Sequence, residues 1–265
     1  MLYLYVRWVS SGVIVRRMLK PEIEELLVRY AEQYETAEFL NGDPSWFMHQ
    51  VDGVENKEAM AFIASVLSYG SRTQFMPKIQ LILECSGGEV DTWLRQGHYA
   101  QQFGTDDNSC FYRLYTHATM NGFLRAYQQL LTEHGTLGSY VSENATDGLS
   151  AVECICRWFR EHGGCGVIPK DAQSACKRVC MFLRWMVRAN SPVDLGLWSS
   201  FIDRRTLVIP MDTHVLSEAG RLGLINGRTA TMSAALRLTH KLAEIFPEDP
   251  LKGDFALFGY GVRKE

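Results

Sequence analysis

Apolar residues recur three and four positions apart along most of this chain, which is the spacing of amphipathic helices. Strict alternation of apolar and polar residues, typical of half-buried strands, is sustained nowhere, although residues 111–115 are compatible with a short strand. We therefore expect a nearly all-α fold of one or two helical lobes. The pattern predicts helices near residues 21–34, 57–67, 74–83, 121–133, 147–162, 177–188, 212–224 and 231–246, and a last one after Pro250.

The first 17 residues differ in character from the rest of the chain. They are apolar but interrupted by Arg7, Arg16 and Arg17, and they are too short to span a membrane. Pro21 then opens the first predicted helix, because proline is favoured in a first helical turn. We expect residues 1–17 to form a peripheral extension, residues 18–265 to form a single domain, and no membrane to be a partner.

Composition narrows the class of protein further. The chain has 265 residues and a net charge of −3, and its part from Ala151 onward carries a small excess of basic side chains. An odd number of cysteines, seven, lies mostly in predicted helices, which favours buried thiols in a reducing cytoplasm over a disulfide framework. Cys154 and Cys156, like Cys176 and Cys180, lack the paired spacing of zinc ligands, so we expect no metal and no cofactor.

The helix predicted from residue 177 has a basic side. Lys177, Arg184 and Arg188 fall within about 20° of one line, opposite an apolar stripe that predicts the core-facing side. One interpretation is a solvated basic face, and the other is a cationic ridge along a cleft. Lys177 falls in the first turn, where the helix dipole disfavours a proton on its amine, as a lysine nucleophile requires.

Asp212 directly precedes another helical run and is a natural N-cap for it. Capping alone would explain an aspartate here. The two roles are nevertheless compatible, because one carboxylate oxygen can accept backbone N–H bonds while the other faces a substrate. By itself His214, in the first turn of that helix, is most simply structural.

Two other segments carry groups suited to a nucleic acid, and both have a plainer explanation. The glycine-rich turn at residues 163–166 offers backbone N–H groups to a phosphate, but it also fits an ordinary turn between helices. Tyr69, Arg72 and Gln74, after an apolar helix, are suited to gripping a base, but they would equally serve as helix ends.

These residues together resemble a known family. Pro210-Met-Asp212-Thr-His214-Val, followed by Arg221-Leu-Gly-Leu, is similar to a motif of the helix-hairpin-helix DNA glycosylases, the superfamily of endonuclease III and 8-oxoguanine glycosylase. Residues 62–68 resemble an early helix of that superfamily, and residues 153–188 occupy the place of its helix-hairpin-helix element. Residues 179–188 and 249–261 also resemble an uncharacterised bacterial family distantly related to those enzymes.

The resemblance implies two helical lobes with a central cleft, the second lobe including about residues 147–224. It implies catalysis by Lys177 and Asp212, with the lysine amine attacking the anomeric carbon of a flipped nucleotide and the aspartate stabilising positive charge. Residues expected to bind the DNA backbone are Gly163, Gly164, Gly166, Arg178, Arg184, Arg188 and His214. Those expected to form a base pocket are Tyr69, Arg72, Gln74 and Trp198.

The sequence also departs from the family pattern. The spacings from Pro169 to Lys177 and from Lys177 to Asp212 exceed those of endonuclease III, although the archaeal 8-oxoguanine glycosylase branch also has a long lysine–aspartate separation. No cysteine comes after Cys180, so the iron–sulfur cluster of endonuclease III is not expected.

Three function classes are consistent with these observations. The first is a monomeric DNA glycosylase acting on double-stranded DNA, with or without strand-cleaving lyase activity. The second is a catalytically silent relative that binds DNA or a nucleotide-like ligand. The third, which fits the modest charge, is an α-helical interaction module without a nucleic-acid role.

Overall fold

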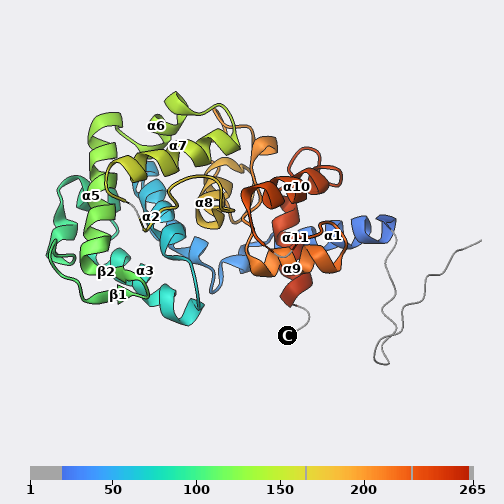
Figure 1. Cartoon of the computed structure of the whole chain (residues 1–265), viewed down its shortest axis with the longest axis horizontal. Coiled ribbons are helices and arrows are strands. Elements are labelled where there is room, and N and C mark those ends of the chain that lie inside the picture. Colours follow the sequence, from blue (N-terminus) through green and yellow to red (C-terminus); the bar gives the residue numbers. More distant parts are fainter. Residues whose placement is uncertain (1–19, 165, 228, 263–265) are drawn as a thin grey trace, which may run out of the picture.

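Helices make up most of the structure, a computed structural model that describes residues 20–164, 166–227 and 229–262 (Figure 1). The expected all-α class is confirmed, apart from one small hairpin of two strands. The predicted extension at residues 1–17 lies outside the described residues. Within the described part of the chain, no helix has both the length and the apolar character needed to cross a bilayer.

The first half of the chain surrounds a buried helix, α2 (Val54–Leu67). Residues 58–67 of α2 are all buried, because they are almost uniformly apolar and neighbours cover every side of the helix. Packed against it are η2 and helices α3, α4 and α8. The other elements of this half are α1 (Lys20–Tyr34), η1 (Ala37–Leu40), η2 (Pro44–His49), α3 (Arg72–Ser86), α4 (Val90–Arg95), η3 (His98–Gln101) and the antiparallel strands β1 (Cys110–Tyr112) and β2 (Tyr115–Thr116).

The second half begins directly after the hairpin. Several of its helices start at a Thr or Asp side chain that accepts a backbone N–H three residues further on, which is the usual N-cap arrangement. Its elements are α5 (His117–His134), α6 (Leu137–Asn144), α7 (Gly148–Glu161), α8 (Lys177–Val187), η4 (Arg204–Thr206), α9 (Thr213–Arg221), α10 (Met232–Ala243) and α11 (Lys252–Val262).

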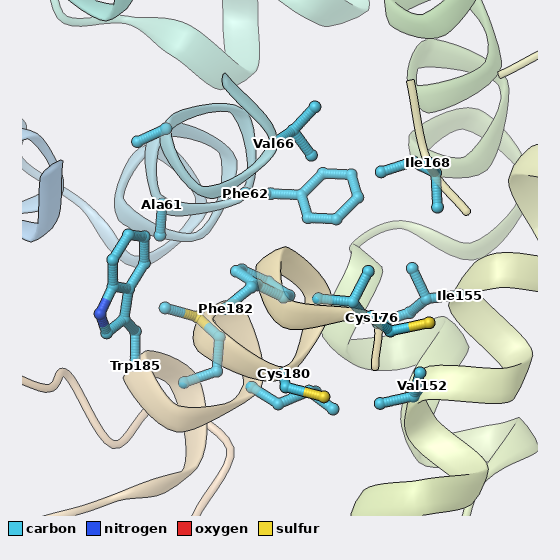
Figure 2. Close-up of a cluster of buried hydrophobic side chains, with 14 of the residues drawn as sticks. Ala61, Phe62, Val66, Val152, Ile155, Ile168, Cys176, Cys180, Phe182 and Trp185 are labelled. Carbon is cyan, nitrogen blue, oxygen red and sulfur yellow. The ribbon is translucent and has the colours of Figure 1, made fainter. Parts of the chain in front are cut away.

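Helix α8 lies at the centre of the molecule. Figure 1 shows α5, α6 and α7 on one side of it and α1, α9, α10 and α11 on the other. In Figure 2, Phe182 of α8 faces Phe62 of α2, and their ring centroids are 5.0 Å apart. Ile155 and Val152 approach the same cluster from α7. The apolar stripe predicted for α8 is therefore part of a hydrophobic core that reaches from α1 to α11.

Candidate functional site

The structure brings Lys177 and Asp212 together. Lys177 is the first residue of α8, and Asp212 is the N-cap of α9. One carboxylate oxygen, Oδ1, accepts the Val215 N–H at 2.9 Å, and the other, Oδ2, lies 3.0 Å from the Lys177 Nζ. The aspartate thus caps its helix with one oxygen and presents the other to the lysine.

Both side chains of this pair reach solvent, at 37% exposure for Lys177 and 30% for Asp212. Burial raises the pKa of Asp212, but the charge of Lys177 and the Val215 N–H outweigh it, so the net pKa lies below its ordinary value. His214, exposed in the first turn of α9, adds a smaller effect of the same sign. Asp212 is therefore ionised at neutral pH and can stabilise a positive charge beside it.

The predicted basic ridge is wrong for Arg184 of α8 and for Arg188, the C-cap of that helix. Arg184 and Arg188 do share a side with Lys177, but both are buried, and Arg188 is only 1% exposed. Acidic residues cover that side and pair with both guanidinium groups: Asp194 comes from the segment after α8, and the others come from distant parts of the chain. Neither arginine can contact a DNA phosphate, because neither reaches the surface.

Asp254 of α11 is a neighbour of the site that sequence reasoning missed. It pairs with Arg184 at 2.5 Å, and the charges of Asp212 and Lys177 act on it. Burial raises its pKa, Arg184 lowers it and Asp212 raises it again, with a net increase. Asp254 and Asp212 are thus two neighbouring carboxyl groups shifted in opposite directions. The spacing of Asp254 from the Asp212 motif gave no signal of this proximity.

Arg178, expected to bind DNA backbone, is half-buried. Its guanidinium donates to the Val66 carbonyl at the end of α2 and to the Tyr115 hydroxyl, the latter at 2.6 Å. It also lies over the ring of Tyr69, 5.1 Å from the centroid. The Arg178 guanidinium therefore joins the end of α2 to the β1–β2 hairpin.

The residues predicted to form a base pocket do not meet at one place. Arg72 is exposed on α3 and pairs with Asp43, and Gln74 is exposed further along the same helix. Trp198 is the clear correction, because it is buried and its indole N–H donates to Glu58 at 2.9 Å. An indole that satisfies a buried carboxylate cannot stack on a base at the surface.

The glycine-rich turn is also only partly free. Gly163 and Gly166 adopt left-handed φ angles of 96° and 92° and are exposed. Gly164 is buried against Phe159 and donates its N–H to the Phe159 carbonyl at 2.7 Å. Gly164 is therefore not a phosphate donor, because its N–H is already used inside the turn. The segment between α7 and α8 is a long connection rather than a tight hairpin.

Two hollows among the described residues lie away from the lysine–aspartate pair. One of about 660 Å³ lies between α1, the end of α8 and the connection from α10 to α11. Another lies beside α4 and η3. In the described ranges, no three His, Cys, Asp or Glu side chains are grouped so as to hold a metal ion. The central cleft expected from the glycosylase resemblance stays a prediction.

Comparison with known proteins gives a family without an assigned activity. A family model described as a protein of unknown function, DUF2400, matches residues 43–263, which include α2, α8 and the Lys177–Asp212 pair. Neither the curated proteins nor the solved structures gave a match. Since the family model covers most of the chain, this protein belongs to the DUF2400 family.

Proposed function

We propose that this protein is a DNA base-excision glycosylase with lyase activity, in which Lys177 is the nucleophile and Asp212 its electrostatic partner. The observation that carries the proposal is the 3.0 Å contact between the Lys177 amine and the Asp212 carboxylate, formed by two helix starts and open to solvent. Nucleophilic amines that work in this way need a nearby group to stabilise the cationic intermediate.

The proposed chemistry joins the lysine nitrogen to C1′ of a nucleotide flipped out of a duplex. As the N–C1′ bond forms, the glycosidic bond breaks and its electron pair leaves with the base. Of the three protons on the Lys177 ammonium, one departs with the base and one moves to O4′ when the sugar ring opens. The third remains on the imine nitrogen, and the positive charge of this imine lies beside Asp212.

The opposite pKa shifts of Asp212 and Asp254 support a chemical role for Asp212 and a different role for Asp254. Asp212 is kept ionised beside the reacting nitrogen, whereas burial raises the pKa of Asp254, which pairs with Arg184 behind Lys177 and Asp212. Neighbouring carboxyl groups whose environments separate their pKa values are frequent in active sites.

A second candidate is a DNA-binding relative without catalysis. The Lys177–Asp212 contact also fits this candidate, since each Asp212 oxygen already has a partner within the protein, Val215 N–H or Lys177, and neither hollow described above adjoins the pair. In that case the ion pair would join α8 to α9, and DNA would be bound by neighbouring cations.

Borohydride trapping separates the two candidates. Duplexes with an oxidised base or an abasic site are incubated with the full chain and sodium borohydride, which reduces an imine to a stable protein–DNA adduct. The glycosylase predicts an adduct with the wild type and a loss of about 100-fold or more in Lys177→Ala. Lys170→Ala is the matched control, because Lys170 is a lysine of the preceding connection that reaches solvent and should leave trapping unchanged.

The alternative outcomes are equally distinct. An adduct that persists in Lys177→Ala would remove Lys177 from the mechanism. No adduct with retained, salt-dependent duplex binding would select the silent relative, and no binding at any salt concentration would exclude both DNA functions.

A further inference from the structure

Three buried cysteine side chains lie where α7 meets the start of α8. Cys156 belongs to α7, Cys180 belongs to α8, and Cys176 is the N-cap of α8. All three are free thiols. Figure 2 shows Cys176 and Cys180 beside Ile155 and Val152 of α7, and Cys156 comes one helical turn after Val152, on the same side of that helix. This junction therefore gathers sulfur atoms that the proposed glycosylase chemistry does not use.

Two of these thiols contact each other. The Cys156 thiol donates a hydrogen bond to the Cys176 sulfur, and the Ser174 hydroxyl oxygen lies 3.5 Å from the same sulfur. The Cys180 thiol donates instead to the Ala175 carbonyl, at 3.5 Å. Two sulfur atoms in hydrogen-bond contact need only a small movement to form a disulfide of about 2.05 Å. The geometry therefore pairs Cys156 with Cys176 and leaves Cys180 outside the pair.

The surroundings make Cys176 the reactive member of the pair. The hydrogen bond from Cys156 lowers the pKa of Cys176, burial raises it and Ser174 lowers it again, with a net decrease to about 7. The pKa of Cys156 is raised by its hydrogen bond to Cys176 and by burial. The thiolate is the form that attacks an oxidant, and a helix N-terminus favours it. Cys176 is thus suited to attack, and Cys156 is suited to capture the oxidised sulfur.

The backbone at Cys176 is strained and adjoins a loop. Its φ of 44° is a left-handed angle that a non-glycine residue adopts only at a cost. Cys176 ends the connection from α7 to α8, whose described residues form no helix. Segments of this kind open locally at a low cost in free energy. A small oxidant can therefore reach the Cys176 sulfur although the folded chain covers it.

We propose that Cys176 is a peroxide-sensitive modification site and that Cys156 converts the oxidised form to a reversible disulfide. The Cys176 thiolate attacks one peroxide oxygen and the O–O bond breaks, which leaves a sulfenic acid on Cys176 and releases hydroxide. The hydroxide takes up the proton that Cys176 had lost and becomes water. The Cys156 sulfur then attacks the sulfenic sulfur and its hydroxyl group leaves with the Cys156 proton as a second water. The two thiols together lose two electrons to the peroxide.

This pair is also placed to act on the candidate site. Lys177 directly follows Cys176, and Figure 1 shows α7 and α9 on opposite sides of α8. Closure of Cys176 onto Cys156 draws the start of α8 toward α7, away from the Asp212 carboxylate. We therefore expect oxidation to loosen the 3.0 Å contact between Lys177 and Asp212, whatever reaction that pair performs.

Disulfide mapping of the native full chain after treatment with hydrogen peroxide tests the site. Remaining thiols are alkylated before digestion with trypsin. Cys176 is then the only cysteine of residues 171–177, and Cys156 lies with Cys154 in residues 126–157. We expect these two peptides to be linked in the wild type and in Cys154→Ser, and not in Cys156→Ser. Cys154 is the matched control, because it is buried on the same helix and donates to the Ala151 carbonyl at 3.3 Å.

The contrary results are distinct. A Cys176 that stays open to alkylation after peroxide treatment, or that is linked to Cys180, would overturn the proposal. So would a link that persists in Cys156→Ser. The wild-type map alone identifies the partner of Cys176, so the test does not depend on whether Cys156→Ser folds. Dithiothreitol should restore both free thiols, because thiol–disulfide exchange reverses the modification.

The effect on the candidate site is measured by acetylation of Lys177 with an N-hydroxysuccinimide ester, followed by mass spectrometry. Loss of the Asp212 partner favours the neutral amine, so Lys177 should react about threefold faster in the oxidised chain, and dithiothreitol should reverse the change. Lys241, exposed on α10, is the control and should keep its rate. An unchanged Lys177 rate in the fully oxidised chain would overturn the coupling to the candidate site.

Discussion

At the scale of single residues, the site depends on the different partners of the two oxygens of one carboxylate. Asp212 caps α9 with Oδ1 and holds Lys177 with Oδ2, so a structural role and a chemical role coincide in one side chain. The sequence motif predicted both residues. It could not show that Arg184 and Arg188 are buried, because most of the acids that pair with them, Glu35, Asp249 and Asp254, are far away in the chain.

Substitution of Asp212 can separate these two roles. Asn retains an oxygen for the Val215 N–H, so Asp212→Asn should cost only a few tenths of a kcal/mol in the capping contribution, whereas Asp212→Ala should cost about 1 kcal/mol. Both variants lose the charge beside Lys177, so both should lower borohydride trapping by about 100-fold. Chemical denaturation and trapping are measured on the same samples.

The comparison has a clear contrary result. If Asn restores trapping to the wild-type level, the charge of Asp212 is not used and the residue is a helix cap only. Thr231→Ala removes the comparable N-cap of α10 and serves as the control for a purely structural loss.

At the scale of elements, the helical periodicity predicted most helices but not what joins them. The spacing of apolar residues is a local property, and it placed α1, α2, α7, α8 and α10 close to their observed positions. The hairpin depends on a strained two-residue turn supported by Tyr69 and Gly70, which lie outside its own sequence. Its strands were therefore only a possibility in the sequence, and its exposed tip was not foreseen.

The start of α6 shows how one element depends on another. Glu58 of α2 is buried, and its carboxylate accepts the N–H groups of Leu137 and Gly138 and the indole N–H of Trp198. A carboxylate at the start of a helix is favourable. Burial nevertheless dominates, and it raises the pKa of Glu58 to about 7 although these three hydrogen bonds act to lower it.

This shift makes stability depend on pH. The unfolded Glu58 releases its proton near the ordinary value of 4.5, whereas the folded one retains it up to about 7. The folded state therefore binds more protons in this interval, and the free energy of unfolding should fall as pH rises from about 4.5 to 7, by at most about 3 kcal/mol. Urea unfolding across this range should show a flatter profile in Glu58→Gln.

Glu55→Gln is the matched control, because Glu55 is exposed on the same helix and should keep the wild-type profile. If Glu58→Gln retains the full wild-type decline between these pH values, the decline comes from another group. A wild-type stability that rises through the interval would show that the three hydrogen bonds outweigh burial.

At the scale of the whole molecule, α8 joins the two groups of helices on either side of it. Its apolar side packs on α2 and α7, and its charged side faces α9, α11 and the segment near residue 194. A series of neighbouring charges leads from the partly exposed Lys177–Asp212 pair to Asp254 and its partner Arg184. Asp194 then links Arg184 to Arg188. The site is thus the solvent-exposed end of a buried ionic network, which helps to fix where α8 and α9 begin.

Arg188 is the residue on which this network depends most. Its guanidinium bonds to Asp194, lies 2.8 Å from Asp249 and lies 2.7 Å from Glu35, which directly follows α1. Arg188→Ala would leave Glu35 and Asp249 without their cation and Asp194 with Arg184 alone, and we expect a loss of about 3–5 kcal/mol in the free energy of unfolding. Arg188→Lys should recover little, because all donors of an ammonium are on one nitrogen, whereas the guanidinium reaches these carboxylates from Nε, Nη1 and Nη2.

The exposed pair of Arg205 and Asp203 provides the control, and Arg205→Ala should leave the free energy of unfolding nearly unchanged, because solvent screens an exposed ion pair. Charge can also be separated from packing. Burial raises the pKa of Asp194, and the charges of Arg184 and Arg188 lower it by less, so the net shift is upward. Acidification should therefore protonate Asp194 and reduce the difference in unfolding free energy between the wild type and Arg188→Ala, measured by urea unfolding. A deficit that stays constant with pH would mean that the loss comes from packing around the arginine side chain, and that the ionic network does not stabilise the junction of α1, α8 and α11.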